Sequence, residues 1–264
     1  MSRMEFITRT NGPATMELAP GVLVHMLATG SLGAVGLTTA MATFRPGAKV
    51  SYHLHPFSEV IVVLSGMALI HVEGRRYLLK QFDAMHVPAG IPHAVHNASS
   101  DSEAVLHSLF PSATPTRGAV DREFAVEDRD STTAHCPEHL VRFATAPVYE
   151  LAPQAHFRDL FARRFGAHGL CGGYGVFGPG ASLPCHYHGY DESITIVSGH
   201  AVCQVAGREY ALSDYATACI PHGRPHRFLN HSDQPMAMIW VYAGDEPERT
   251  LVDTCLCQNE TSGT

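Results

Sequence analysis

The chain has 264 residues, of which 45% are hydrophobic, and a formal net charge of -7. This length suffices for two cores of about 100 residues each, and the negative charge argues against nucleic acid and anionic membranes, which attract basic proteins. No run approaches the roughly 18 apolar residues of a membrane-spanning helix, and the first 21 residues hold no apolar stretch typical of a signal peptide. We therefore expect a soluble, cytoplasmic protein with no nucleic-acid or membrane partner.

Short segments rich in Val, Ile, Leu and Tyr, separated by Gly and Pro, predict strands and tight turns of an all-β barrel or sandwich. Residues 60–64 and 194–197 are the clearest strands. The turns that close the following hairpins contain glycine, which adopts the positive φ they require: Gly66, Gly74, Gly199 and Gly207. Segment 157–165, FRDLFARRF, has partial helical spacing but a strand-like counterpart in the other half, and its structure is left open.

The segment 112–146 is polar and charged and predicts a connection between two domains. We expect domains over residues 1–111 and 147–264, with 112–146 as the linker. The seven cysteines are odd in number and form no CxxC pair. They therefore predict reduced thiols, with Cys185 packed on a strand and Cys255 and Cys257 without a role.

Each half carries the same pattern of potential metal ligands. Gly-x5-His-x-His-x3-Glu-x6-Gly occurs at residues 47–66 and again at 180–199, and Pro-x-Gly-x2-His-x3-Asn occurs at 88–97 and 221–230. Every counterpart residue is 133 positions away. A constant offset through both motifs indicates a duplicated backbone plan.

Histidines two apart on a strand project from the same face of the sheet. His53 and His55 therefore point into the first barrel together, where Glu59 and His93 approach from other strands. The second half repeats this set with His186, His188, Glu192 and His226. Three imidazoles and a carboxylate suit divalent Fe, Mn, Co, Ni, Cu or Zn, and an octahedral ion would keep two positions open. We expect two such ions per chain, with iron favoured.

At these residues the chain resembles the cupin superfamily, and in particular its two-domain members, the bicupins. The resemblance implies two tandem antiparallel barrels of the double-stranded β-helix or jelly-roll type, with the eight residues above as ligands. One departure is that the glycine that usually opens the second motif is replaced by Phe82 and Tyr215. Cupins include dioxygenases, decarboxylases, isomerases, lyases, sugar binders and storage proteins, so the resemblance alone names no reaction.

The surroundings of the two ligand sets differ. At an offset of 133, Tyr190, Asp191, Arg224 and Trp240 of the second half correspond to Phe57, Ser58, Ile91 and His107 of the first. The more polar second set favours the second site as the catalytic one, with Glu192, Tyr190 and Arg224 as catalytic candidates and Glu59 as the equivalent carboxylate in the first site. The alternative is that Tyr190 lies on a surface turn and Arg224 forms a salt bridge.

Three functions fit the sequence. The first is a non-haem dioxygenase that cleaves a small aromatic, enolic or β-dicarbonyl compound, with Glu192 accepting a proton as in the quercetinase-like cupins that the chain resembles. The second is a redox-neutral lyase, isomerase or decarboxylase that uses the metal as a Lewis acid. The third is binding of a metabolite or sugar without catalysis, which two complete ligand sets argue against. Sheet edges also predict a homodimer.

Overall fold

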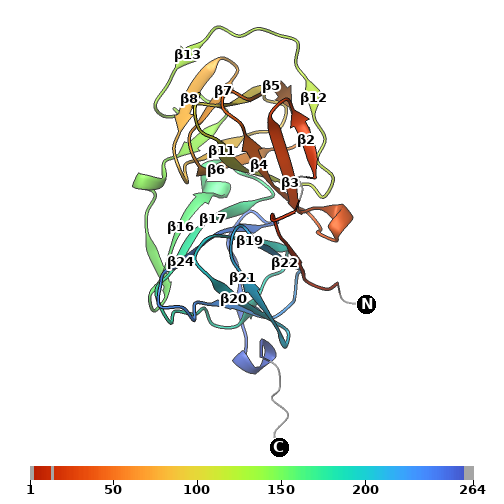
Figure 1. The fold of residues 1–264 in the computed structure, drawn as a ribbon, viewed down its shortest axis with the longest axis vertical. Helices are drawn as coiled ribbons and strands as arrows, with labels where there is room; N and C mark the ends of the chain where they lie inside the picture. Colours follow the sequence, from red (N-terminus) through yellow and green to blue (C-terminus); the bar gives the residue numbers. More distant parts are fainter. Residues whose placement is uncertain (1–2, 13–14, 259–264) are drawn as a thin grey trace, which may run out of the picture.

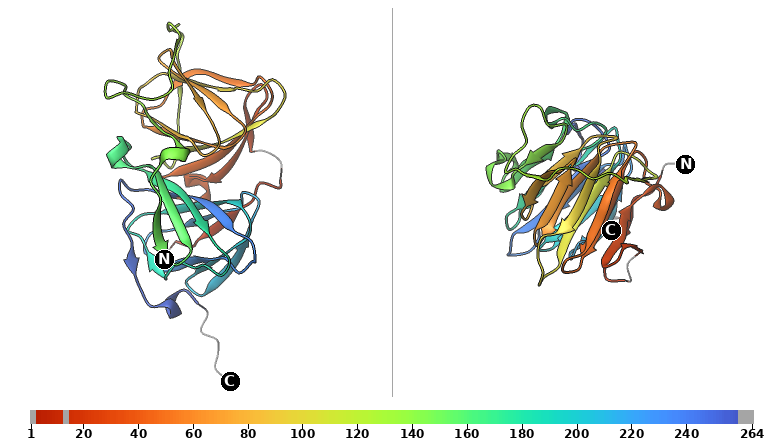
Figure 2. Two further views of the ribbon diagram at one scale, coloured as in Figure 1. Left: turned by 90° about the vertical axis from the view of Figure 1, so that its left-hand side faces the viewer. Right: turned by 90° about the horizontal axis from the view of Figure 1, so that it is seen from above.

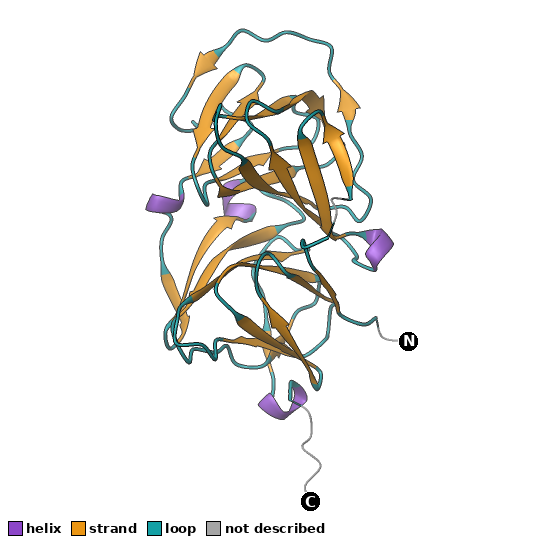
Figure 3. Cartoon of the chain, viewed as in Figure 1, coloured by secondary structure: helices purple, strands orange, loops and turns teal. Residues whose placement is uncertain are grey.

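The computed structural model describes residues 3–12 and 15–258, and its regular secondary structure is almost entirely β-strand (Figures 1 and 3). Two barrels lie one above the other along the long axis, the first coloured red to yellow-green and the second green to blue. The predicted all-β fold with two tandem barrels is therefore confirmed. Four short 3-10 turns are the only helical elements of the described residues: η1 Gly30–Leu32, η2 Phe143–Thr145, η3 Arg163–Phe165 and η4 Thr254–Leu256. No helix among those residues could span a membrane.

The first barrel is formed by a seven-stranded sheet, ordered β14-β9-β6-β11-β4-β3-β2, and a six-stranded sheet, ordered β12-β5-β10-β7-β8-β13. Its strands are β2 Met16–Ala19, β3 Val22–Ala28, β4 Thr38–Phe44, β5 Lys49–Leu54, β6 Glu59–Ser65, β7 Ala68–Val72, β8 Arg75–Leu79, β9 Ala84–Val87, β10 His93–Asn97, β11 Ala104–Phe110, β12 Gly118–Ala119, β13 Glu127–Asp128 and β14 His139–Val141.

The second barrel repeats this plan with a seven-stranded sheet, β1-β22-β19-β24-β17-β16-β15, and a five-stranded sheet, β21-β20-β23-β18-β25. Its strands are β1 Phe6–Thr8, β15 Tyr149–Ala152, β16 Ala155–Phe161, β17 Cys171–Phe177, β18 His186–Tyr187, β19 Glu192–Ser198, β20 Ala201–Val205, β21 Arg208–Leu212, β22 Thr217–Ile220, β23 His226–Leu229, β24 Met236–Tyr242 and β25 Thr250–Leu251.

The chain does not divide simply into halves. Strand β1 pairs with β22 and so lies in the second barrel. The segment 112–146 contributes β12, β13 and β14, and each of these pairs with a strand of the first barrel. This segment crosses the outside of the first barrel before the chain enters the second (Figure 2). The boundaries at 111/112 and 146/147 stay a prediction for the folding units.

Three apolar cores hold the fold together. One fills each barrel, and the third lies between the two seven-stranded sheets. The alternation of side chains along a strand explains this arrangement: in β6, Ile61 and Val63 face the first barrel's interior, whereas Val60 and Val62 face the core between the barrels. The two sheets that carry the glutamate ligands are therefore buried on both faces and rigidly placed.

The predicted turns form as expected. Glu73 and Gly74 both have positive φ, as do Ala206 and Gly207 in the equivalent hairpin, which matches the hairpin turns favoured by strand twist. Segment 157–165 is mainly strand, since β16 runs to Phe161, and only the 3-10 turn η3 at its end is helical. Phe82 and Tyr215 keep the positive φ of the glycine they replace, at 63° and 62°, a conformation that costs a non-glycine residue free energy.

Candidate metal centres

The first set of predicted ligands converges inside the first barrel. His53 of β5 lies opposite His93 of β10 in the sheet, His55 follows the end of β5, and Glu59 is the first residue of β6. Oε2 of Glu59 lies 2.8 Å from Nε2 of His93, 3.2 Å from that of His55 and 3.9 Å from that of His53. All four side chains are buried. Three strands and one turn thus bring the four residues to one point.

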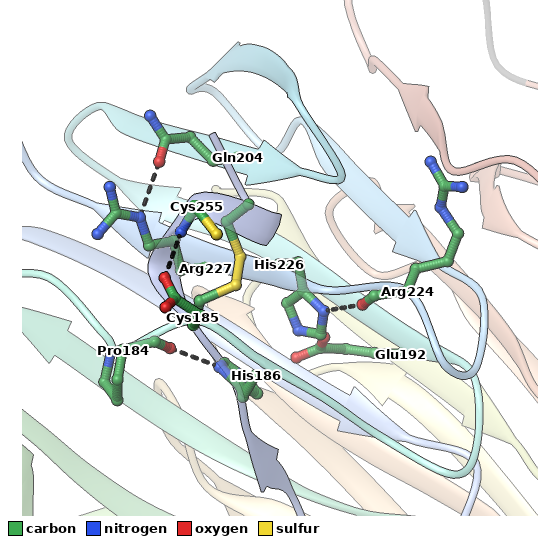
Figure 4. Close-up of a disulfide and its surroundings, with 11 residues drawn as sticks. Pro184, Cys185, His186, Glu192, Gln204, Arg224, His226, Arg227 and Cys255 are labelled. Carbon is green, nitrogen blue, oxygen red and sulfur yellow. Dashed lines mark hydrogen bonds and ion pairs between the residues drawn. A yellow bond between two sulfur atoms is a disulfide. The ribbon is translucent and has the colours of Figure 1, made fainter. Parts of the chain in front are cut away.

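The second set has the same origin in the second barrel. His186 of β18 lies opposite His226 of β23, and Glu192 begins β19. The three imidazoles offer ring nitrogens within 4.8 Å of one another. Oε2 of Glu192 lies 2.6 Å from Nε2 of His226 and 3.7 Å from Nε2 of His188. Figure 4 shows His186, Glu192 and His226 facing a common point.

All six imidazoles are oriented through Nδ1, which lies 2.6 to 2.9 Å from a backbone carbonyl oxygen. A carbonyl oxygen can only accept a hydrogen bond, so each Nδ1 carries a proton, and in the neutral ring Nε2 is the nitrogen whose lone pair is directed into the site. The carbonyls are those of Ser51, Thr116 and Ile91 in the first barrel and of Pro184, Glu248 and Arg224 in the second. The backbone therefore sets the tautomer that metal binding needs.

The donor set in each barrel fits a divalent metal ion. Across the two sets, four ligand atoms are buried without a hydrogen bond of acceptable geometry to any described residue: Nε2 of His55 in the first barrel, and Nε2 of His188, Nε2 of His226 and Oε2 of Glu192 in the second. Oε2 of Glu192 and Nε2 of His226 belong to this group because, although they lie 2.6 Å apart, they do not form a hydrogen bond with acceptable angles. Because the converging atoms are lone-pair donors, a cation satisfies them together, and imidazole with carboxylate suits transition metals.

The carboxylates are ionised in this environment. Burial by itself raises the pKa of Glu59, yet the three surrounding imidazoles hold it well below its usual range. Burial acts in the same sense on Glu192, whose pKa nevertheless falls to about 2 because of His226 and His188. Burial, with His226 nearby, lowers the pKa of His186 to about 3. Burial also acts to lower the pKa of His55 and His226, but the neighbouring Glu59 and Glu192 raise it overall. The two carboxylates are therefore present in the form that binds a metal, and a bound cation would displace any proton from these imidazoles.

A cavity of about 440 Å³ opens onto the first ligand set, since His53, His55 and Glu59 form part of its wall. Most of the wall is apolar, and Ser108 and Arg117 contribute polar groups. The apolar part comes from Leu18, Val24, Met26, Ala40, Ala42 and Phe110. A small molecule that entered this cavity would contact the ligand set directly.

Aromatic rings fill the equivalent position in the second barrel. The ring of Tyr242 lies over His188, with 4.3 Å between ring centroids, and Trp240 lies 4.9 Å from Tyr242. The second barrel also has a cavity, of about 620 Å³, but its wall contains Trp240 and Tyr242 and none of the four ligands. The aromatic side chains thus screen the second ligand set from the cavity.

Trp240 is the counterpart of Ser108, so the sequence-based pairing of Trp240 with His107 is wrong. In the sheets Trp240 lies opposite Ile194, and Ser108 lies opposite Ile61, which is the counterpart of Ile194. The offset therefore changes from 133 to 132 between β10 and β11, and equally between β23 and β24.

A loop of unequal length explains the change. The side-chain amide of Asn97 donates to the carbonyl of Ser102, five residues on, whereas that of Asn230 donates to Gln234, four residues on. The loop in the first barrel is one residue longer, and each later counterpart shifts by one. His107 consequently corresponds to Ile239 and lies on the strand face that packs between the barrels.

The two polar candidates near the second set make structural contacts. The Tyr190 hydroxyl lies 2.8 Å from the carbonyls of Glu246 and Glu248, and its ring stacks on His188. Arg224 donates to Glu5 at 2.5 Å, which is the salt bridge considered as its alternative role. Figure 4 shows the Arg224 guanidinium directed away from Glu192. Catalytic roles for Tyr190 and Arg224 stay predictions.

Sequence reasoning missed the arginine at the mouth of each cavity, Arg117 and Arg249. Both follow a proline in a repeated Pro-x-Arg, 132 positions apart, at 115–117 and 247–249. The middle residues, Thr116 and Glu248, supply the carbonyls that orient His55 and His188. An alignment that allowed one gap would have revealed this third repeated motif.

The expectation that all cysteines are reduced is wrong for one pair, because Cys185 forms a disulfide with Cys257 (Figure 4). Cys185 does point away from the ligand face, as its alternation with His186 predicts, and there it meets the C-terminal segment. In the first barrel the equivalent residue, Tyr52, packs against Phe124, with 4.7 Å between ring centroids. In each barrel, the segment after the Pro-x-Arg motif is thus held against the strand at equivalent positions, by a disulfide in the second barrel and by an aromatic contact in the first.

Comparisons with known proteins agree with this architecture. The cupin domain family matches residues 40–110 and 173–242. Over 105 residues the chain is 30% identical to "Polyketide synthase CurC" of Streptomyces cyaneus. The aligned region covers 39% of this chain and 68% of that protein. An oxalate decarboxylase of Lactobacillus farciminis, solved as a formate complex, superposes with a TM-score of 0.75 at 16% identity, over 96% of this chain and 89% of that one. A Bacillus subtilis oxalate decarboxylase structure, whose title concerns its Mn(II) centres, gives 0.73 at 15% identity, over 96% and 80%.

Proposed function

Since this chain belongs to the cupin family, with a cupin domain in each half, we propose that it is a metal-dependent enzyme whose first barrel performs redox-neutral chemistry on an enolisable carbonyl compound. The observation that carries this proposal is the first cavity, whose wall includes three of the four ligands of a complete set. The second set has no such access. The proposal therefore assigns catalysis to the first barrel, in place of the second barrel favoured from the sequence.

The lining of the first cavity suggests the substrate class. Its apolar wall suits a hydrophobic or aromatic body, and Arg117 at its mouth can bind a carboxylate or an enolate oxygen. A β-dicarbonyl or aromatic keto acid has both features. The similarity to a protein named polyketide synthase supports this class, since a polyketide chain is a series of such carbonyl groups.

Glu59 is the residue best placed to handle a proton, because it is the one acidic side chain among the described residues lining the cavity. When bound, a divalent metal supplies a Lewis acid that polarises a substrate carbonyl. The Glu59 carboxylate, ionised at neutral pH, can accept a proton from carbon or oxygen of a substrate held by Arg117. The apolar wall excludes water from the reacting atoms. Manganese and iron both suit the donor set.

The dioxygenase placed first from the sequence is the second candidate. Three imidazoles, a carboxylate and an apolar cavity are equally compatible with oxygen chemistry. The redox-neutral alternative has the better support, because two of the structures with the same fold are titled oxalate decarboxylases, whose reaction is a decarboxylation.

The test is to incubate metal-loaded protein with a panel of β-diketones and aromatic β-keto acids in matched anaerobic and aerobic vessels. The expected result is substrate loss at the same rate in both, without oxygen uptake. Turnover confined to the aerobic vessel would favour the dioxygenase. Failure in both vessels, with about two ions per chain confirmed by elemental analysis, would contradict the proposed substrate class.

A further inference from the structure

The cavity of the second barrel, about 620 Å³, has no contact with the metal ligands and yet carries groups that lack partners. We infer that it is a separate binding site for a planar aromatic carboxylate or a similar organic anion. This goes beyond the proposed function, because the site would bind a second small molecule and the reaction of the first barrel does not require it.

The strongest observation is the indole of Trp240. The residue is 3% exposed and lines the cavity, and its Nε1 has no hydrogen-bond partner among the described residues. A buried N–H group without a partner costs free energy comparable to a lost hydrogen bond, and the indole N–H can only donate. A ligand whose acceptor oxygen reached Nε1 would remove the penalty.

The charge of the cavity selects an anion. Asp159 is already engaged, since it accepts from the Tyr149 hydroxyl at 2.6 Å and pairs with Arg164. Arg249 is half-buried and makes no hydrogen bond or ion pair with the described residues. The cavity wall therefore carries one cation in excess, and a guanidinium binds a carboxylate through two parallel hydrogen bonds.

The walls select a flat ring. Tyr149, Phe157, Trp240 and Tyr242 line the cavity, and aromatic faces hold a planar ligand by offset or edge-to-face contact. The first barrel has Met16, Val24 and Ser108 where the second has Tyr149, Phe157 and Trp240. Only Tyr242 has an aromatic counterpart there, Phe110, so three of the four rings are particular to the second barrel. Because none of the metal ligands lines this cavity, the structure supports binding there and not reaction.

Trp240 is the only tryptophan of the chain, so its fluorescence reports on this cavity without a label. The experiment titrates the metal-loaded full-length protein with benzoate, with benzyl alcohol as the neutral analogue and acetate as the anion without a ring. The expected result is a saturable change in Trp240 emission with benzoate, and at least tenfold weaker binding of both analogues. The absence of a saturable change with benzoate would overturn the inference.

A matched pair of arginine variants locates the site. Arg249→Gln should weaken benzoate binding about tenfold, the value of one charge-assisted contact. Arg117→Gln, which changes the equivalent arginine of the first barrel, should leave the Trp240 titration unchanged. Equal effects of the two variants, or no effect of Arg249→Gln, would overturn the inference. Thermal unfolding of both variants checks that each is folded, and calorimetry on Trp240→Phe should show weaker binding because the N–H group is lost.

Discussion

The two barrels share their metal chemistry and differ in access to it. Each brings three imidazoles and a glutamate together, and each orients its imidazoles through backbone carbonyls. In the first barrel Ser108 leaves a cavity that reaches the ligands, whereas in the second Trp240 stands at the equivalent position and the ligands are screened. The comparison teaches that a complete ligand set identifies a metal site, and that access decides which site can react.

The largest expected effect comes from removing one ligand in each barrel. His53→Ala and His186→Ala should each lower metal content by about one ion per chain, because one imidazole of four is lost. Only His53→Ala should reduce turnover, by roughly a hundredfold or more, given that even indirect partners of a ligand cost 10–100-fold. Elemental analysis and steady-state kinetics on the same preparations measure both. The reverse kinetic result would move catalysis to the second barrel.

The next effect tests access without touching a ligand. Ser108→Trp gives the first barrel the side chain of the second, and the indole should fill the cavity and reduce turnover about a hundredfold while metal content stays at two ions. The mirror variant, Trp240→Ser, should open the second set and speed metal removal by a chelator. A Ser108→Trp variant with normal turnover would show that substrate does not use this cavity. Ser108→Ala serves as the control for loss of the hydroxyl.

The fold and the ligands could be predicted from the sequence because both depend on local spacing. His53 and His55 share a strand face by alternation alone, and the hairpin at Gly74 follows from the positive φ that glycine permits. The constant offset of 133 then carried the same argument to the second half. These features need no knowledge of which distant side chains meet.

What could not be predicted depends on distant contacts and on one inserted residue. The longer loop after Asn97 shifts β11 by one position, and a one-residue shift exchanges the two faces of a strand. That shift hid the contrast between Ser108 and Trp240 on which access depends. The bond between Cys185 and Cys257 spans 72 residues and has no spacing signal. The salt bridge of Arg224 requires β1 to cross into the second barrel, which no pattern indicates.

A smaller effect is expected from the two contacts that hold the segment after each Pro-x-Arg motif to its barrel. Cys257→Ser should lower the free energy of unfolding by about 2–4 kcal/mol, since the disulfide closes a long loop. Phe124→Ala, which removes the ring that packs on Tyr52, should cost about 1 kcal/mol. Urea unfolding measures both, and reduced wild-type protein should match Cys257→Ser. If reduction changes nothing, the bond does not form in solution. Alkylation at lysis shows whether it forms in the cell, since a reducing compartment would keep these thiols unpaired.

The smallest effect concerns the core between the barrels, where His107 stands in the place of Ile239. His107 is fully buried, both ring nitrogens lack partners among the described residues, and burial lowers its pKa to about 3. The unfolded chain protonates this imidazole near pH 6.5 and the folded protein does not. Stability is therefore highest above pH 6.5 and falls as the pH drops towards 3, by up to about 1.4 kcal/mol per pH unit from this group.

His107→Ile, which copies the second barrel, should flatten this dependence and raise stability in acid. Denaturant unfolding between pH 7 and 4 measures the slope, with the exposed His231→Gln as control. The control should keep the wild-type slope because it leaves the buried imidazole of His107 in place. A His107→Ile variant with an unchanged slope would mean that the acid sensitivity arises elsewhere, and the ligand histidines, whose protonation also releases the metal, would then be the groups to examine.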